Sequence, residues 1–144
     1  MKFWESSAVV PLLVGEPSSS GVLAEYLGDP EVVVWWATEV ECVSAMARLE
    51  RDGSIVMPAL SEALGRLDAL ALAWHEVQPT DRIRQVAIRL LRVHSLRAAD
   101  AFQLAAAIAA AEDQPGSLSL VTLDSRLAGA ADREGFRVVS PIAM

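Results

Sequence analysis

The segment FWESSAVVPLLVGE, from Phe3 to Glu16, places a single carboxylate, Glu5, between two apolar stretches. The opening residues 1–4 (MKFW) predict a short buried strand, and Ala8–Val14 predict a helical turn. A carboxylate at the end of a buried strand is costly unless it is hydrogen-bonded or paired. Glu5 is therefore either a satisfied structural group or part of a site that requires negative charge.

The order of strand followed by helix recurs along the chain. The apolar run Val32–Trp36 predicts a second strand, and LSLVTLD (Leu118–Asp124) predicts a third strand that ends in a carboxylate, as FWE does. A final strand is expected at FRVV (Phe136–Val139). Helices are expected in between, at residues 21–27, 38–52, 60–72, 81–93, 101–112 and 125–133. This alternation predicts a single α/β domain over residues 1–144, with a short parallel sheet flanked by helices.

Composition restricts the class of protein. Of 144 residues, 53% are hydrophobic and 22% are charged, which is typical of an ordered domain rather than a disordered chain. The apolar stretches are shorter than the roughly 20 residues that a membrane span requires, and no basic leader precedes an apolar segment. The single cysteine, Cys42, cannot form an internal disulfide. We expect a cytoplasmic protein without membrane segments.

The charge balance bears on nucleic-acid binding. With 19 acidic and 12 basic residues, the net charge of −7 opposes nonspecific binding to phosphate backbones. Any nucleic-acid chemistry therefore requires a local basic patch, bound divalent cations, or both. A helix face with several arginines is usually solvated, but beside a nuclease site it would hold phosphates. The basic residues are concentrated in one region, at Arg82, Arg84, Arg89, Arg92 and Arg97.

Four acidic residues occupy positions that suggest a common site. Ligands of open parallel sheets bind outside the carboxyl ends of the strands. Glu5 and Asp124 follow two predicted strands, while Glu41 and Asp100 lie near helix starts. Clustered carboxylates repel one another unless cations neutralise them, and oxygen-only ligands favour Mg²⁺ or Mn²⁺. The pattern predicts a metal site suited to hydrolysis of a phosphodiester.

Most of these positions also have a purely structural interpretation. Thr38 and Glu41 match a helix capping box, and Asp124 is a plausible N-cap for residues 125–133. Asp100 lies within an apolar helix pattern, where a structural role is harder to find, so a functional role is favoured there. The adjacent Trp35 and Trp36 indicate either core or interface, and we favour core.

Four segments, in their order and spacing, resemble the PIN-domain family, and within it the VapC-type toxins of bacterial toxin–antitoxin pairs. They are WESSAVVPLL, TEVECVSAMARLER, LRAADAFQLAAA and LVTLDSRLAGAADREGFRVV. The resemblance implies a Rossmann-like three-layer α/β/α sandwich and metal-dependent endoribonuclease activity, with Mg²⁺ or Mn²⁺ held by carboxylates. It also implies an RNA substrate, a small cognate antitoxin and a homodimer.

The resemblance assigns site residues one by one. Glu41 matches the second acid of the family, with Glu39 as a less suitable competitor, Asp100 the third and Asp124 the fourth. Ser6 or Ser7 matches the small hydroxyl residue near the first acid. Thr122 matches the threonine two residues before the last acid.

The first acid departs from the family pattern, because the family has aspartate where this chain has Glu5. Glutamate moves the carboxylate by about 1 Å or more, whereas metal ligands must lie within roughly 0.2 Å of their preferred distances. The exchange implies a tolerated variant, an altered metal preference or a weakened enzyme. Two functions follow: an endoribonuclease toxin, or a catalytically weakened PIN domain that acts as a binding or regulatory module.

Overall fold

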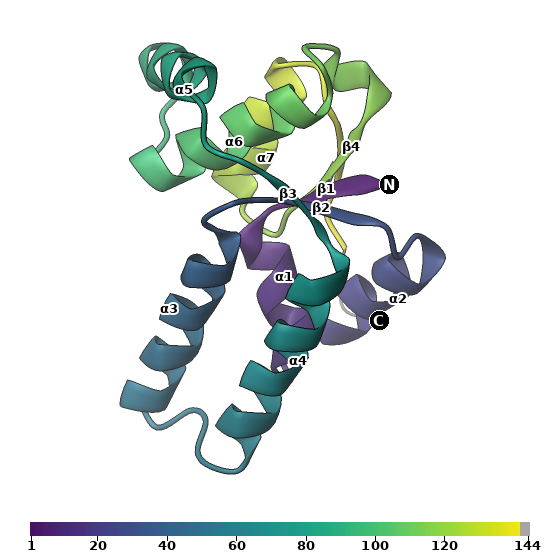
Figure 1. The fold of residues 1–144 in the computed structure, drawn as a ribbon, viewed down its shortest axis with the longest axis vertical. Coiled ribbons are helices and arrows are strands. Elements are labelled where there is room, and N and C mark those ends of the chain that lie inside the picture. Colours follow the sequence, from purple (N-terminus) through teal and green to yellow (C-terminus); the bar gives the residue numbers. More distant parts are fainter. Residues whose placement is uncertain (142–144) are drawn as a thin grey trace.

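A parallel sheet forms the centre of the computed structural model, which describes residues 1–141 (Figure 1). Neighbouring strands pair in the order β3-β2-β1-β4-β5, and every pair is parallel. The carboxyl ends of all the strands therefore meet at one edge, as the α/β prediction requires. Within the described residues the strands are β1 (Lys2–Trp4), β2 (Val32–Trp35), β3 (His75–Val77), β4 (Ser119–Val121) and β5 (Arg137–Val139).

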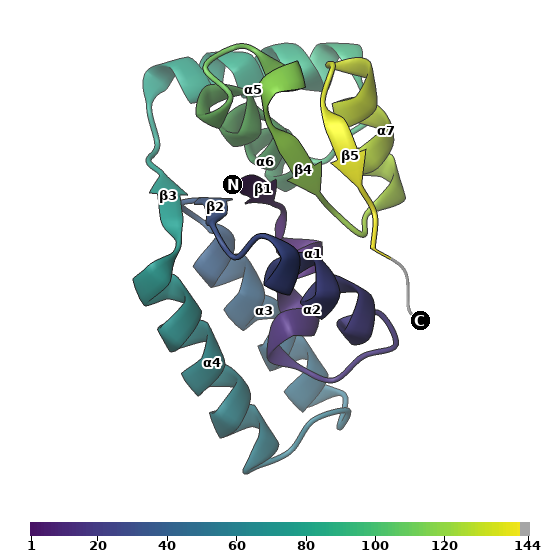
Figure 2. The ribbon, with the colours of Figure 1, turned by 90° about the vertical axis from the view of Figure 1, so that its right-hand side faces the viewer.

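Helices cover both faces of this sheet and complete the expected three-layer sandwich (Figure 2). One face is covered by α1 (Ser6–Leu13), α2 (Ser19–Gly28), α3 (Thr38–Arg51) and α4 (Ala59–Ala73). The other is covered by α5 (Asp81–Val93), α6 (Ala98–Ala110) and α7 (Ser125–Arg133), with a short 3-10 turn at Pro115–Ser117. Helices α3 and α4 extend away from the sheet as an antiparallel pair.

The core follows from the alternation of side chains along each strand. Phe3 packs into the layer of α5, α6 and α7, whereas the adjacent Trp4 packs into the layer of α1 to α4. Both side chains are fully buried. Cys42 is buried in the same layer as Trp4, where it acts as a small core residue. Burial on both faces explains why β2, with the sequence VVVW, is entirely apolar.

The structure differs from the sequence-based expectation in one strand and in the bounds of several other elements; helix α6, for example, begins at Ala98 rather than at residue 101. Strand β3 was not predicted, because its sequence, HEV, is polar and largely exposed at the sheet edge, and only its pairing with β2 defines it. Helix α1 begins at Ser6, before the expected start, because Glu5 caps it. The third predicted strand was too long, since β4 ends at Val121 and leaves Asp124 to cap α7.

The described helices also bear on the membrane prediction. Within residues 1–141, no helix combines the length and the apolar character needed to cross a bilayer.

Candidate active site

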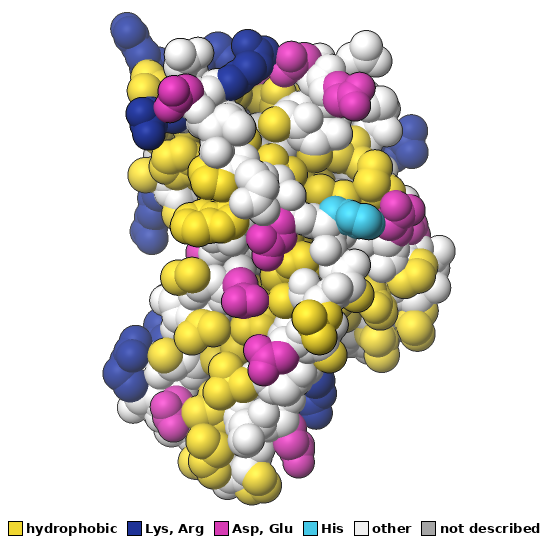
Figure 3. Space-filling model, viewed as in Figure 1, with side chains coloured by type: hydrophobic (Ala, Val, Ile, Leu, Met, Phe, Trp, Pro, Cys, Tyr) yellow, Lys and Arg dark blue, Asp and Glu magenta, His cyan; other side chains and the backbone are white. Residues whose placement is uncertain are grey.

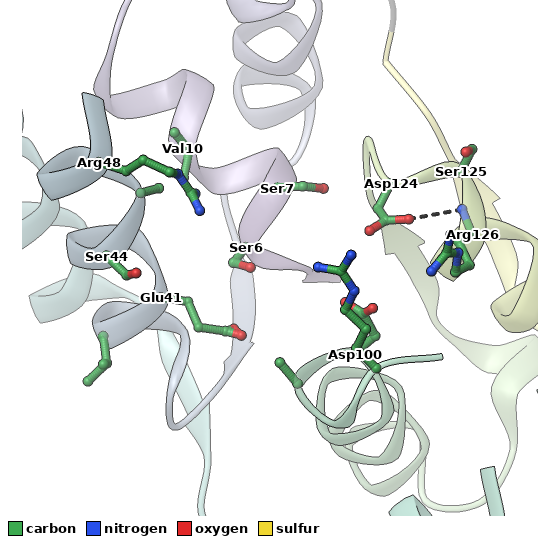
Figure 4. Close-up of a pocket in the computed structure, with 14 residues that line it drawn as sticks. Ser6, Ser7, Val10, Glu41, Ser44, Arg48, Asp100, Asp124, Ser125 and Arg126 are labelled. Carbon is green, nitrogen blue, oxygen red and sulfur yellow. Dashed lines mark hydrogen bonds between the residues drawn. The ribbon is translucent and has the colours of Figure 1, made fainter. Parts of the chain in front are cut away.

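A cleft of about 750 Å³ opens at the carboxyl edge of the sheet, between the amino-terminal ends of four helices (Figure 4). Three of the four predicted acids line it: Glu41 from α3, Asp100 from α6, and Asp124 at the start of α7. Their side chains point toward a common space in Figure 4. The three acids, which lie up to 83 positions apart in the chain (from Glu41 to Asp124), therefore meet at one site.

The fourth acid, Glu5, does not line the cleft but lies beneath it. Its side chain is only 4% exposed, and the neighbouring Ser6 and Ser7 line the cleft in its place. Glu5 is the N-cap of α1, because its carboxylate accepts from the backbone N–H of Ser7 at 3.1 Å. The carboxylate also accepts from the hydroxyls of Ser6 (3.1 Å), Ser7 and Thr122 (2.8 Å). The buried charge is thus satisfied by four donors.

Thr122 and Ser7 connect this carboxylate to the last acid. The Thr122 hydroxyl donates to Glu5 and accepts from the backbone N–H of Asp124 at 3.0 Å. The Ser7 hydroxyl likewise donates to Glu5 and accepts from the N–H of Leu123 at 2.9 Å. Through these two hydroxyls, Glu5 orients the loop that carries Asp124. Burial raises the pKa of Glu5, and its hydrogen bonds oppose this rise.

Glu41 is held by a residue that the sequence did not single out. The Nε2 of Gln103, on α6, donates to Glu41 Oε2 at 2.8 Å and to the hydroxyl of Thr38 at 3.1 Å. The predicted capping box of Thr38 and Glu41 is wrong, because the N-cap of α3 is Ala37 and no side chain caps this helix. Burial raises the pKa of Glu41, with the charges of Glu5 and Asp100 adding to the effect.

Asp100 and Asp124 form the other side of the cleft. Asp124 is an N-cap, as predicted: its Oδ1 accepts from the N–H groups of Arg126 at 2.9 Å and Leu127 at 3.1 Å. Burial raises the pKa of Asp100, and the charge of Asp124 raises it further. The capping role of Asp124 leaves its second oxygen free of these bonds, so capping and ligand binding are compatible.

The donor set fits a hard divalent cation in its chemistry. All candidate ligands are oxygen atoms, which Mg²⁺ and Mn²⁺ prefer. The charge of one carboxylate raises the pKa of the next for both Glu41 and Asp100, while the nearby charges of Arg97 and Arg126 oppose this rise at Asp100. Within residues 1–141, no three His, Cys, Asp or Glu side chains lie close enough together to enclose an ion. The carboxylates thus converge without forming a closed ligand set.

Three arginines line the cleft together with the acids: Arg48 of α3, Arg97 before α6, and Arg126 of α7. Within the described chain, none of them takes part in an ion pair. Only Arg97 belongs to the basic group noted in the sequence. Arg48 and Arg126 were missed because they are far from that group in the chain.

The other predicted arginines lie outside this cleft, on α5. Arg82 pairs with Asp113 at 3.0 Å, and Arg89 pairs with Glu134 at 2.9 Å. Arg84 approaches Asp81 at 3.5 Å and lines a second cavity, whereas Arg92 is exposed.

Several known proteins are similar to this chain, although no family model matches it. Ribonuclease VapC49 of Mycobacterium tuberculosis (strain ATCC 25618 / H37Rv) is 32% identical over 136 residues, which cover 94% of this chain and 92% of that protein. Ribonuclease VapC35 of the same strain is 32% identical over 144 residues, covering 98% and 97%. A solved toxin–antitoxin complex from Klebsiella pneumoniae contains a chain with a TM-score of 0.67 at 17% identity and full coverage of both chains, which indicates a shared fold.

The three-layer sandwich and the acidic cleft at the carboxyl edge of its sheet define a PIN-like α/β protein. With 32% identity over nearly its whole length to the curated relatives, the chain belongs to the VapC-type family of PIN domains.

Proposed function

We propose that this chain is a metal-dependent endoribonuclease, acting as the toxin of a type II toxin–antitoxin pair. The observation that carries the proposal is the convergence of Glu41, Asp100 and Asp124 in one cleft with arginines that form no ion pair within 4.0 Å in the described chain. Excess carboxylate charge suits a cation, and unpaired guanidinium groups suit phosphates. Membership of the VapC-type family adds support.

Each group in the cleft has a proposed role. Glu41, Asp100 and Asp124, together with the underlying Glu5, would hold Mg²⁺ or Mn²⁺. Such an ion, when bound, supplies Lewis acidity for hydrolysis of a phosphodiester bond. The three arginines hold the phosphates on either side of the scissile bond and orient the RNA backbone. Gln103 and the hydroxyls of Ser7 and Thr122 keep the carboxylates in place.

The partners belong to the same proposal. We expect RNA as the substrate, a small antitoxin as the inhibitor, and a cytoplasmic location where both are available. A homodimer is also expected, and apolar side chains on the surface of α3 are suited to an interface: Val40 is 69% exposed and Val43 is 42% exposed.

One observation supports the second candidate, a catalytically weakened PIN domain that serves as a binding or regulatory module. Glu5 is buried beneath Ser6 and Ser7, and its carboxylate already accepts four hydrogen bonds. A carboxylate so occupied is less available to a cation than the acids that line the cleft. This candidate predicts stable folding and partner binding without metal-dependent cleavage.

Cleavage of a panel of transfer and ribosomal RNAs separates the two functions. The reactions contain Mg²⁺, Mn²⁺ or chelator, and use the wild-type protein, Asp100→Asn and a matched control, Asp68→Asn. Asp68 is an exposed acid on α4, away from the cleft, so its replacement makes the same change in charge. We expect cleavage that requires metal, persists in Asp68→Asn and disappears in Asp100→Asn. Folded wild-type protein that cuts no RNA with either metal contradicts the enzyme and favours the module.

A further inference from the structure

A second cavity, lined by aromatic residues, lies beside the acidic cleft. We propose that it binds one unpaired nucleobase of the RNA next to the scissile phosphate, with Trp36 as the stacking surface. This inference rests on the proposed function for its choice of ligand. The cavity has a volume of about 620 Å³ and is lined by Trp35, Trp36, Ala37, Pro79, Thr80, Asp81, Arg84 and Phe102.

The aromatic residues of this cavity comprise a stacked pair, Trp35 and Phe102, and an exposed indole, Trp36. The rings of Trp35 and Phe102 stack with centroids 5.7 Å apart and an interplanar angle of 4°. Trp35 is 6% exposed, so the core holds this pair in place, whereas Trp36 is 51% exposed. The expectation that both tryptophans belong to the core is right for Trp35 and wrong for Trp36. An exposed indole beside a cavity offers a flat π-surface on which a base can stack.

The cavity continues from the cleft along two helices. At the start of α3, the N-cap residue Ala37 lines the cavity, and Val40 and Glu41, three and four residues later, line the cleft. On α6, Ala99 lines the cleft, and Phe102, three residues later, lines the cavity. Residues three and four apart lie on one helical face, so the two spaces are neighbours. Figure 3 shows one face of the molecule in space-filling form. Near the centre of that view, between the upper and lower helices, acidic side chains lie beside hydrophobic ones.

The polar rim favours a nucleotide over an apolar protein segment. Thr80, Asp81 and Arg84 border the aromatic surface, so a ligand there meets both a π-face and hydrogen-bonding groups. Arg84 is 71% exposed, and its contact with Asp81 at 3.5 Å is a weak surface pair that leaves guanidinium N–H groups available. Stacking on an aromatic side chain, with a cation beside it, is the common way proteins hold unpaired bases.

Binding in chelator tests this inference separately from catalysis. The probe is a pool of short, labelled RNA oligonucleotides of random sequence, compared with an abasic ribose-phosphate oligomer of equal length. The proteins are the wild type, Trp36→Ala, Trp36→Phe and the control Leu72→Ala, which removes a 91% exposed apolar side chain on α4. Loss of one stacked base is worth about 1–3 kcal/mol, so Trp36→Ala is expected to bind the pool about 5- to 150-fold more weakly. Trp36→Phe retains most of the affinity, and Leu72→Ala binds as the wild type does.

The abasic oligomer and the oligomeric state complete the test. Trp36→Ala should not alter affinity for the abasic oligomer, because no base is present to stack. Equal affinity of wild type and Trp36→Ala for the pool overturns the inference, as does a wild type that binds no RNA. A change in oligomeric state in Trp36→Ala without a change in RNA affinity assigns the cavity to protein contacts and also overturns it. If RNA binding depends on Trp36 but the protein never cleaves RNA, the inference is supported and only the proposed nuclease activity is contradicted.

Discussion

The side-chain amide of Gln103 donates to Glu41 Oε2 at 2.8 Å and so links two helices on opposite faces of the sheet. Gln103 is 1% exposed and belongs to the buried face of α6. The same Nε2 also contacts the buried hydroxyl of Thr38 at 3.1 Å. Gln103 therefore helps to orient Glu41 in the cleft from the opposite layer of the sandwich.

Replacement of Gln103 should impair the site without removing any candidate ligand. We expect Gln103→Leu to reduce metal affinity or cleavage by about 10- to 100-fold, because residues that orient metal ligands have effects of this size. The measurement is the Mg²⁺ dependence of RNA cleavage, with circular dichroism to verify the fold. Gln85→Leu, which replaces an exposed glutamine on α5, is the control. An unchanged Mg²⁺ dependence in folded Gln103→Leu would show that this hydrogen bond does not position Glu41.

Stability should depend on pH through the site carboxylates. The folded chain raises the pKa of Glu5, Glu41 and Asp100 above the ordinary values of 4.5, 4.5 and 3.8. Folded protein thus retains protons that the unfolded chain loses. The stability that these groups contribute is fully present below the ordinary values and is lost as pH rises through the folded values. Glu134 acts in the opposite direction: Arg89 and His94 lower its pKa, so its contribution is lost as pH falls.

Urea unfolding in chelator across this pH range measures the effect. We expect the site carboxylates to lower the free energy of unfolding as pH rises from 4.5 toward neutrality. Asp100→Asn removes one of the three groups. As pH rises, the free energy of unfolding should therefore fall less steeply for Asp100→Asn than for the wild type. A constant difference between the two proteins at every pH would be inconsistent with a raised pKa at Asp100.

Glu5→Asp restores the residue that the family usually has but should not improve this protein. The four donors around Glu5 match the longer side chain, so a shorter one leaves buried donors without an acceptor. Each such group costs about 1–3 kcal/mol, and we expect a loss of stability of that order with no gain in cleavage. Urea unfolding and RNA cleavage are measured for Glu5→Asp and for Glu50→Asp, the same change at an exposed position. A rise in cleavage would instead show that Glu5 weakens the enzyme.

The cleft arginines should account for the salt dependence of RNA binding. Removing one phosphate contact lowers the slope of log affinity against log salt by about 0.7 for a single strand. We expect Arg48→Gln, Arg97→Gln and Arg126→Gln each to lower the slope by about this amount. Arg92→Gln, on the exposed face of α5, is the control. Binding of a labelled RNA in chelator at several salt concentrations gives the slopes. An effect of Arg92→Gln equal to the others would assign RNA binding to α5 as well.

The sequence by itself determined the features that depend on neighbouring residues. Apolar runs and helix signals predicted β1, β2, β4, β5 and the amphipathic helices, because side-chain periodicity reflects burial directly. Asp124 was recognised as an N-cap, since the cap and the N–H groups it bonds are adjacent in the chain. The order of four motifs also indicated the family to which the chain belongs.

Only the tertiary structure decided how the site is assembled. Strand β3 exists because its backbone pairs with β2, not because of its polar side chains. Gln103 reaches Glu41 across 62 positions of sequence, and Thr122 reaches Glu5 across 117. Such contacts depend on which helices and loops the folded sheet brings together, and no local pattern records them. The same packing buries Glu5 beneath two serines and gathers three arginines from separate elements around the acids.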